Sequence, residues 1–420
     1  MNTVAEQPAI QPARLRSNVA ALSILQVMNY AVPLATVPYL VRVLGPAHFG
    51  LLAFAQALIV YFDLLTDYGS LLSATRAVAV HRHDSEALSH IFWRTAAARL
   101  ALAFGCALAL SALVLAAPPL RAAATLYAAA FLTVIGTAIF PVWFFQGIEQ
   151  MKYVTAAHSS ARVLTIPALF LLVRHPDHYV RAAAVQGAVP VLAGILVAPV
   201  LWRKLRHGFH RPAVSEIAGV LREGWSAFVA NSALVFNATA TITVLGLVAG
   251  AAEVGYYSAA DKVIRALSSL LNPVTQALYP HLNSLKTRSP HLTARLMRRS
   301  YVWIGLPALA VSVATFAVAG PAGLALWGHG FLRSAAVLRC LSPLPFLLAL
   351  VNLIGVQTLL VLGLDSLVSR TVFAAALFNV ALTAWLSASY GALGAAAANV
   401  AGAVLLVCGL AWSARRAVRS

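Results

Sequence analysis

Three carboxylates in this chain lie inside long apolar runs, where a carboxylate can bind a proton or a small cation. Asp63 and Asp67 are four residues apart and therefore share one face of a helix. Asp261 stands four residues before Arg265, which could neutralise it. A charged group at the centre of a bilayer costs about 2.5–3.5 kcal/mol on insertion scales, so it normally faces a cavity or a partner. Asp63 and Asp261 are our candidates for coupling or gating, with a buried structural pair as the alternative; Asp67 could instead pair with Arg76 or cap a neighbour.

Three cations inside apolar runs could bind an anionic substrate. Arg162 falls near the middle of its run, and Lys262 and Arg265 stand beside Asp261. Guanidinium and ammonium groups in a dry cavity suit phosphate or diphosphate, so we predict these three as substrate-binding residues. If Asp261 and Arg265 neutralise one another, Lys262 keeps the excess charge. Arg99 lies only about one turn into its run and is expected to extend its guanidinium to the headgroups.

The elements that must position these residues are transmembrane helices. Of the 420 residues, 61% are hydrophobic and 10% are charged, and the mean hydropathy is +0.82. A soluble chain is about half apolar and about a quarter charged, so we predict an all-α polytopic membrane protein. Apolar runs of about 20 residues, enough to cross a bilayer, number about twelve. They fall near residues 18–43, 48–73, 89–117, 122–146, 152–173, 179–201, 224–249, 254–279, 299–320, 335–362, 366–388 and 391–412.

Positive charge is distributed unevenly among the segments between these runs. The chain has 30 Lys and Arg against 12 Asp and Glu, and most of the cations fall in alternate loops. Cytoplasmic loops collect Lys and Arg, so the N-terminal segment 1–17 and the tail 414–420 are both expected in the cytoplasm. This topology accounts for most of the net charge of +18 without a nucleic-acid partner.

The two halves of the chain share a short repeat. A shift of 205 residues places Gly45–Gly50 over Gly250–Gly255, each predicted to form a tight turn between two helices. Six helices per repeat would give both halves the same orientation, which is the parallel-repeat plan of some transporters. We therefore predict an N-terminal six-helix bundle at 18–201, a basic cytoplasmic linker at 202–223 and a C-terminal six-helix bundle at 224–413.

The sequence lacks the motifs of several other classes. It has no Walker A sequence, which argues against direct ATP drive, and no long external loop that could form a catalytic domain. Its three cysteines lie inside apolar runs, and the stretch His81–Asp84 is interpreted as a solvated loop, so no metal site is predicted. We expect no catalytic residue and no bound cofactor.

Several aromatic residues fall near the predicted membrane interfaces. Tryptophan and other aromatic side chains gather there as belts, because one end is apolar and the other is wet. We interpret the following as belt residues: Trp143, Phe144, Phe145, Trp202, Trp303 and Trp327.

Two stretches carry a family resemblance. The first runs from Pro33 to Ala55 as PLATVPYLVRVLGPAHFGLLAFA, and the second from Asp67 to Arg76 as DYGSLLSATR. Together they closely resemble the N-terminal signature of the Wzx polysaccharide flippases of the multidrug/oligosaccharidyl-lipid/polysaccharide exporter superfamily. The matching positions are Pro38, Arg42, Gly45, Asp67, Tyr68, Gly69 and Arg76. Ser70 stands where the family usually has a phenylalanine-like residue.

The resemblance implies a flippase in a bacterial inner membrane. Such a protein is expected to move an undecaprenyl-diphosphate-linked oligosaccharide, an O-antigen or exopolysaccharide repeat unit, from the cytoplasmic to the periplasmic leaflet. It implies two six-helix bundles around a central cationic cavity, alternating access, and coupling to a proton or sodium gradient. A polysaccharide polymerase and chain-length proteins are the expected partners.

Three other functions remain open at this stage. A multidrug antiporter of the same superfamily would prefer an acidic cavity, which the buried cations disfavour. A membrane enzyme of glycan assembly would need a long external loop with catalytic groups. A membrane scaffold would tolerate loss of the buried charges.

Overall fold

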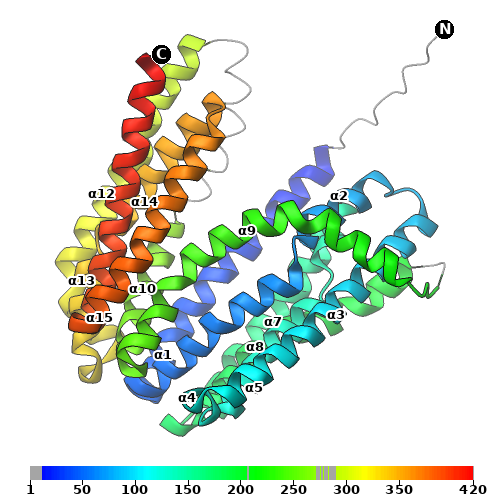
Figure 1. Cartoon of the computed structure of the whole chain (residues 1–420), viewed down its shortest axis with the longest axis horizontal. Coiled ribbons are helices and arrows are strands. Elements are labelled where there is room, and N and C mark those ends of the chain that lie inside the picture. Colours follow the sequence, from blue (N-terminus) through cyan, green and yellow to red (C-terminus); the bar gives the residue numbers. More distant parts are fainter. Residues whose placement is uncertain are drawn as a thin grey trace. The chain divides into compact units, whose positions relative to one another are not determined.

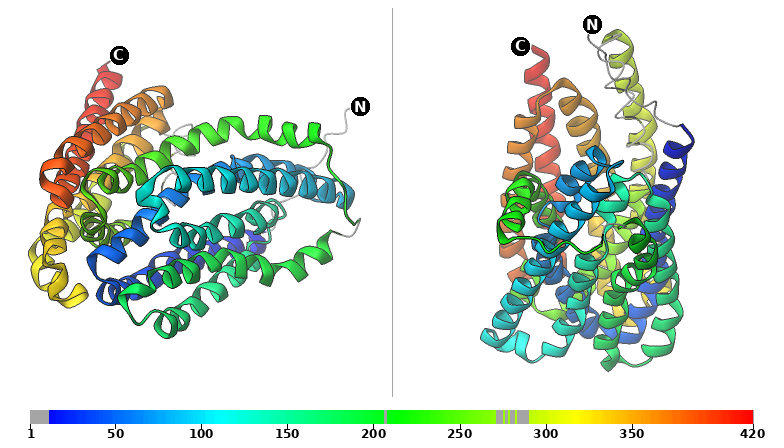
Figure 2. Two further views of the ribbon diagram at one scale, coloured as in Figure 1. Left: turned by 60° about the horizontal axis from the view of Figure 1, so that its bottom comes forward. Right: turned by 90° about the vertical axis from the view of Figure 1, so that its right-hand side faces the viewer.

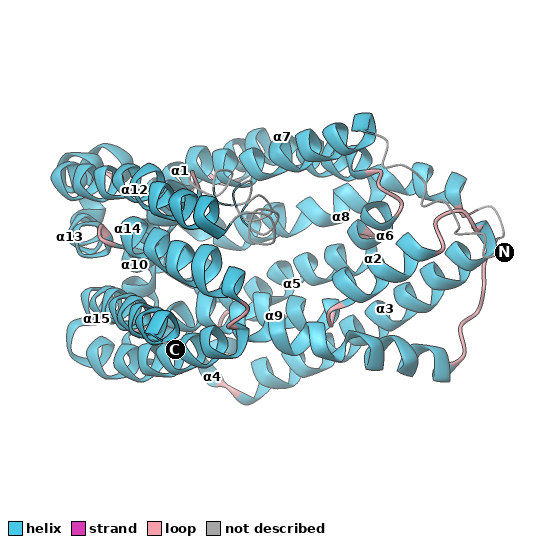
Figure 3. Ribbon diagram, turned by 90° about the horizontal axis from the view of Figure 1, so that it is seen from above, coloured by secondary structure: helices cyan, strands magenta, loops and turns pink. Residues whose placement is uncertain are grey.

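The computed structural model describes residues 12–205, 208–270, 275, 278, 282 and 290–419. Within these residues every regular element is a helix and no strand occurs (Figure 3). In chain order the elements are α1 (Pro12–Asp67), α2 (Ser70–Val80), α3 (Ser85–Ala116), α4 (Pro118–Arg121), α5 (Ala124–Ile139), α6 (Val142–Gly147), α7 (Met151–Leu172), η1 (Pro176–His178), α8 (Tyr179–Lys204), α9 (Val214–Ala249), α10 (Ala251–Ser269), α12 (Pro290–Trp327), η2 (His329–Phe331), α13 (Leu332–Leu341), α14 (Leu344–Val351), η3 (Asn352–Leu360) and α15 (Asp365–Arg419). The predicted all-α class is confirmed.

Long apolar helices dominate the described chain. Eight are long and apolar enough to cross a membrane, and a bent pair within α9 would make nine. Two of the eight merge neighbouring expected spans: Ser366–Arg416, with 51 residues, contains 366–388 and 391–412, and Ala35–Val80, with 46, contains 48–73 and the end of 18–43. The count of spans falls below twelve partly because α1 and α15 each continue as one helix through a short turn, at Gly45 and Gly391. The polytopic character is confirmed.

Glycines produce the kinks within the longest helices. Gly45 interrupts α1 with φ 72° and ψ 172°, and Gly391 interrupts α15 with φ 55°. Backbone at positive φ is open to glycine and strained for residues that carry a Cβ. Gly250, the repeat partner of Gly45, precedes α10 with φ 87° and ψ 175°. The repeat is therefore matched in backbone conformation as well as in sequence.

The second glycine of each repeat makes a close helix crossing. A Cβ on Gly50 would overlap the carbonyl oxygen of Ala251, and a Cβ on Gly255 would overlap that of Pro46. Adding 205 to Gly50 gives Gly255, and subtracting 205 from Ala251 gives Pro46, so each contact is the repeat image of the other. Only glycine lets two backbones approach this closely. The repeat is thus seen in the structure as a reciprocal contact.

The described chain forms two compact units. Unit 1 comprises the beginning of α1 and residues 59–169 and 183–232. In it α3, α5, α7 and α8 run side by side along their lengths (Figures 1 and 2). Its core contains the aromatic residues of α6, which are at most 1% exposed: Trp143, Phe144 and Phe145. The prediction that they form an interface belt was wrong, because they point into the core of unit 1. There they pack with residues of α2, α3 and α7.

Unit 2 comprises residues 33–58, 170–182 and the chain from 233 onward. Here α12 packs against α13 and α14, and α13 and α14 pack against α15. Trp327, at the end of α12, is also buried, whereas Trp202 and Trp303 are exposed as belt residues should be. Because α1 and α9 each contribute to both units, these units are not the predicted bundles 18–201 and 224–413, whose boundaries stay a prediction.

Candidate functional site

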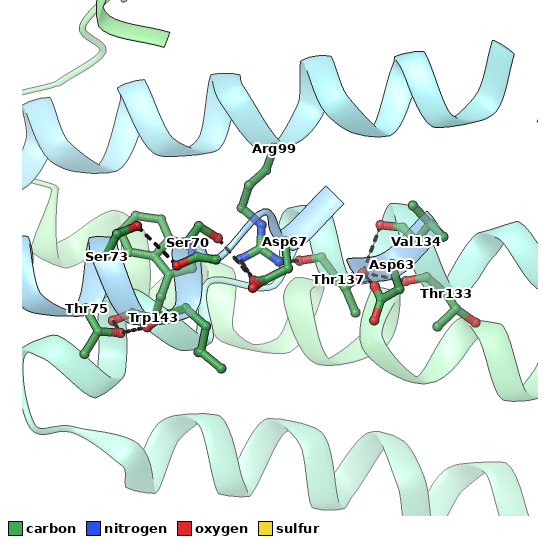
Figure 4. A network of polar contacts seen from close by, with 12 residues as sticks. Asp63, Asp67, Ser70, Ser73, Thr75, Arg99, Thr133, Val134, Thr137 and Trp143 are labelled. Atoms are coloured by element: carbon green, nitrogen blue, oxygen red, sulfur yellow. Dashed lines mark hydrogen bonds and ion pairs between the residues drawn. The ribbon is translucent and has the colours of Figure 1, made fainter. Parts of the chain in front are cut away.

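A network of one buried and two half-buried charged residues in unit 1 joins three helices (Figure 4). The second part of α1 carries Asp63 and Asp67 one turn apart, α3 carries Arg99, and α5 carries Thr137. The i,i+4 spacing places both carboxylates on one helix face, as the sequence predicts. The structure thus brings the two predicted carboxylates together around one cation.

Short contacts hold the network together. The hydroxyl of Thr137 donates a hydrogen bond to Asp63 Oδ1. Arg99 Nη2 donates to the carbonyl oxygen of Thr137 at 2.6 Å, and Arg99 Nη1 lies 3.6 Å from Asp67 Oδ1. Asp67 also accepts the hydroxyl of Ser70 at 3.1 Å. Thr137 therefore connects the two carboxylates: its hydroxyl contacts Asp63, and its carbonyl oxygen contacts Arg99, which pairs with Asp67.

The charge of this network is unbalanced. Two carboxylates and one guanidinium carry a net charge of −1 when all three are ionised. Among the described residues Asp67 has an ion pair, while the contact of Asp63 is the Thr137 hydroxyl. Since an uncompensated buried charge is costly, a proton or a cation at Asp63 would bring the network to neutrality.

The expectation for Arg99 was wrong, and the structure decides between the alternatives left open for Asp67. Arg99 does not extend to the headgroups: it is 5% exposed and turns toward Asp67. An ion pair with a nearby carboxylate stabilises the guanidinium where it is, so the side chain does not need to reach the membrane surface. Asp67 pairs with Arg99 rather than with Arg76, which is exposed. An arginine inside an apolar run was itself the signal that could have identified Arg99; for Thr137 the sequence held no signal.

The family motif Asp67-Tyr68-Gly69 forms the turn between α1 and α2. Tyr68 has φ 43° and Gly69 has φ 73°, so the right-handed helix is interrupted for two residues before α2 begins. The Tyr68 ring stacks on Phe228 of α9, with centroids 4.5 Å apart and planes 11° apart. A Cβ on Gly69 would lie 2.5 Å from the carbonyl oxygen of Gly224. The motif therefore seats the turn against α9.

The family departure at Ser70 has a local function. Ser70 is buried, and its hydroxyl donates to Asp67. A phenylalanine-like residue would fill the space but could not make this bond. The serine fixes the carboxylate that receives Arg99.

Three of the motif residues, Pro38, Arg42 and Gly45, lie in unit 2, whereas Arg76 lies in unit 1. Arg42 donates from Nε to the carbonyl oxygen of Leu326 at 3.0 Å and from Nη2 to that of Ala325. These carbonyls end α12, where a cation complements the helix dipole. Pro38 is half-buried on α1. Arg42 is therefore a helix-capping residue in this structure.

The charged cluster of α10 separates into a pair and a lone cation. Arg265 Nε lies 2.5 Å from Asp261 Oδ2, and Arg265 Nη2 donates to the carbonyl oxygen of Ala238 at 2.9 Å. Lys262 Nζ is 3.4 Å from Gln56 Oε1 and 5.6 Å from the centre of the Phe49 ring. Among the described residues no carboxylate oxygen lies within 4 Å of Lys262 Nζ. Lys262 thus keeps the excess charge, as one reading of the sequence has it.

Arg162 lies in unit 1, whereas Lys262 and Arg265 lie in unit 2. It is half-buried on α7, and its carbonyl oxygen accepts the Thr165 hydroxyl at 2.6 Å. One turn earlier, the ring of His158 stacks on Phe140. The three predicted substrate-binding cations are therefore divided between the two units.

Comparison with known proteins places this architecture. Residues 15–286 match the family described as "Polysaccharide biosynthesis protein". The chain is 30% identical over 382 residues to a protein of Escherichia coli (strain K12) named "Putative O-antigen transporter", covering 91% of this chain and 92% of that one. A protein of the same name from Shigella dysenteriae is 27% identical, over 90% and 95% of the two chains.

Solved structures with the same fold are more distant in sequence. The inward closed conformation of the lipid II flippase MurJ matches with a TM-score of 0.72 at 11% identity, over 95% of this chain and 87% of that chain. An inward-facing multidrug resistance MATE family transporter matches with a TM-score of 0.65 at 15% identity, over 95% and 98% of the chains.

The long apolar helices and the relatives named as transporters place the chain among polytopic membrane transporters rather than enzymes. Within that class the chain belongs to the polysaccharide biosynthesis protein family, by the match over residues 15–286 and the 30% identity over nearly its full length. The resemblance drawn from the first hundred residues is confirmed.

Proposed function

We propose that the protein moves an undecaprenyl-diphosphate-linked oligosaccharide from the cytoplasmic to the periplasmic leaflet of a bacterial inner membrane. The cargo is an O-antigen or exopolysaccharide repeat unit. The observation that carries this proposal is the 30% identity, over 91% of the chain, to a protein named as an O-antigen transporter. The isoprenoid stays in lipid while the diphosphate and sugars cross through the polar interior.

Lys262 is our leading candidate for binding the diphosphate. Its ammonium group contacts an amide and an aromatic ring, which position it without neutralising it. Arg265 is committed to Asp261 and would contribute chiefly if that pair opens. Arg162 is the corresponding candidate in unit 1. These assignments favour an anionic cargo over the cationic drugs of a multidrug antiporter.

Asp63 is our candidate for coupling transport to a proton or sodium gradient. It belongs to a network with one carboxylate more than it has cations, and uptake of one cation balances the charge. Asp261, by contrast, has its own arginine and is proposed only as a gating residue. The proposal also places the protein in the inner membrane with both termini in the cytoplasm. Its proposed partners are a polysaccharide polymerase and chain-length proteins.

Complementation in cells tests this function. In an Escherichia coli strain that lacks its own O-antigen transporter, expression of this chain should restore O-antigen display at the cell surface. The resistance of the same cells to cationic drugs should stay unchanged. Increased resistance to cationic drugs without O-antigen display would contradict the proposal and favour the multidrug antiporter.

A further inference from the structure

A cluster of metal-binding side chains lies away from the buried charges, in unit 1. His90 is on α3, His210 is in the segment between α8 and α9, and Glu216 is in the first turn of α9. The three residues are 120 and 6 positions apart along the chain, so only the fold brings them together. No motif in the sequence predicts this cluster.

The donor atoms converge on one point. His90 Nε2 lies 2.8 Å from Glu216 Oε1, and His210 Nε2 lies 3.5 Å from Glu216 Oε2. All three residues offer a ligand atom within 4.8 Å of the others. Bonds of about 2.0–2.1 Å to a tetrahedral zinc ion place the donors about 3.3 Å apart. The observed separations lie on both sides of that value, so a small movement of the side chains would complete the site.

The neighbouring structure holds the ligands in place. The backbone N–H of Ala213 donates to Glu216 Oε2 at 2.8 Å, which fixes the carboxylate. The indole N–H of Trp93, one turn after His90 on α3, donates to the carbonyl oxygen of Gly208 at 3.0 Å, and its ring packs on Phe209. The segment that carries His210 is therefore already held against α3.

One donor in the cluster is unsatisfied. His210 Nε2 is buried, and among the described residues it has no hydrogen-bond partner, although Glu216 is near. A buried polar atom without a partner costs free energy unless something binds it. A metal ion between the three side chains would satisfy this nitrogen directly.

An ion can reach the cluster from the surface. His90 lines a cavity of about 440 Å³ together with Asp84, Glu86 and Arg94. The side chains of His90 and His210 are 43% and 42% exposed. This exposure leaves room for a water molecule as the fourth ligand.

We propose that His90, His210 and Glu216 bind a divalent transition-metal ion of the zinc class. Two imidazoles with one carboxylate suit zinc, cobalt or nickel, whereas magnesium and calcium prefer oxygen ligands alone. A bound ion would fasten the segment between α8 and α9 to α3. This inference is independent of the proposed transport function.

Cobalt absorption tests the site directly. The full chain is purified with a tag that contains no histidine, and Co²⁺ is titrated while visible absorption is recorded, followed by competition with Zn²⁺. We expect one Co²⁺ per chain, displaced by one Zn²⁺. His90→Ala and His210→Ala should each lower the affinity by about 100-fold or more, since loss of supporting residues outside the ligand shell alone costs 10–100-fold. His83→Ala, which removes an exposed histidine outside the cluster, should leave the titration unchanged.

A second readout separates binding from folding. Zn²⁺ should raise the unfolding temperature of the parent chain and of His83→Ala, but not that of His210→Ala. The proposal is overturned if Co²⁺ produces no stoichiometric band, or if His90→Ala and His210→Ala bind as the parent does. Normal elution of the variants as monodisperse protein shows that a lost signal reflects lost ligands.

Discussion

At the scale of single residues, Arg99 is the buried cation that connects α1, α3 and α5 in unit 1. It is nearly inaccessible, it pairs with Asp67, and it bonds to the helix that carries Thr137. Removing one partner of a buried pair leaves the other charge without compensation, which costs about 3–5 kcal/mol. A pair at the surface contributes only about 0–1 kcal/mol.

Arg99→Ala should therefore destabilise the protein by several kcal/mol, seen as a large drop in unfolding temperature in detergent. Arg94→Ala is the matched control on the same helix, because Arg94 pairs with the more exposed Glu223 at 3.3 Å. Its effect should stay below about 1 kcal/mol. Equal losses for the two variants would contradict the buried-pair account. Adding Asp67→Asn to Arg99→Ala should recover part of the loss.

The three cations should differ in their effect on transport. Lys262→Gln should reduce O-antigen export strongly, because Lys262 keeps its charge available. Arg265→Gln should reduce it less, because Arg265 already neutralises Asp261. Arg162→Ala should impair export and Arg162→Lys should retain part of it. Export is measured at matched expression; full activity of Lys262→Gln would exclude it from the substrate path.

At the scale of helices, the reciprocal glycine crossing is the feature that joins sequence to fold most directly. Gly50→Ala and Gly255→Ala each place a methyl group against a backbone carbonyl. Overpacking of this kind costs about 1–3 kcal/mol. Both variants should lower the unfolding temperature, and by similar amounts, because the two contacts are repeat images.

The control for the glycine crossing is Gly105→Ala. Gly105 lies within α3, and a Cβ there would meet nothing within 4 Å. Alanine favours a helix over glycine by about 1 kcal/mol, so this variant should be neutral or slightly stabilised. If Gly50→Ala behaved like Gly105→Ala, the crossing would not be a close contact in solution.

The helices show how far sequence reasoning reaches. The spans, the pair Asp63 and Asp67, and the glycine repeat were predictable, because hydropathy, i,i+4 spacing and positive-φ glycines act locally. The inward position of Trp143 on α6 was not predictable, because an aromatic residue beside a proline can face either a core or an interface. Arg99 was misjudged for a similar reason, because only the fold shows that the carboxylate of Asp67 lies beside it.

At the scale of the whole molecule, the distribution of Lys and Arg fixes the expected orientation. A reporter that is active only in the cytoplasm should be active when it is fused at residue 420 or in the loop near residue 210. A reporter that is active only in the periplasm should be active when it is fused near residue 121, in the segment between α3 and α5. The reverse pattern would contradict the proposed topology and, with it, the direction of transport.

Transfer of cargo between leaflets tests the central claim most directly. The purified chain is reconstituted into vesicles that contain an undecaprenyl-diphosphate oligosaccharide, and an impermeant glycan-binding probe reports exposure on the opposite leaflet. The account predicts transfer that requires the protein and is accelerated by a proton or sodium gradient. Asp63→Asn should lose the gradient dependence, while Glu86→Gln, which neutralises an exposed carboxylate, should keep it. Absence of transfer with the glycan whose display the chain restores in cells would contradict the account.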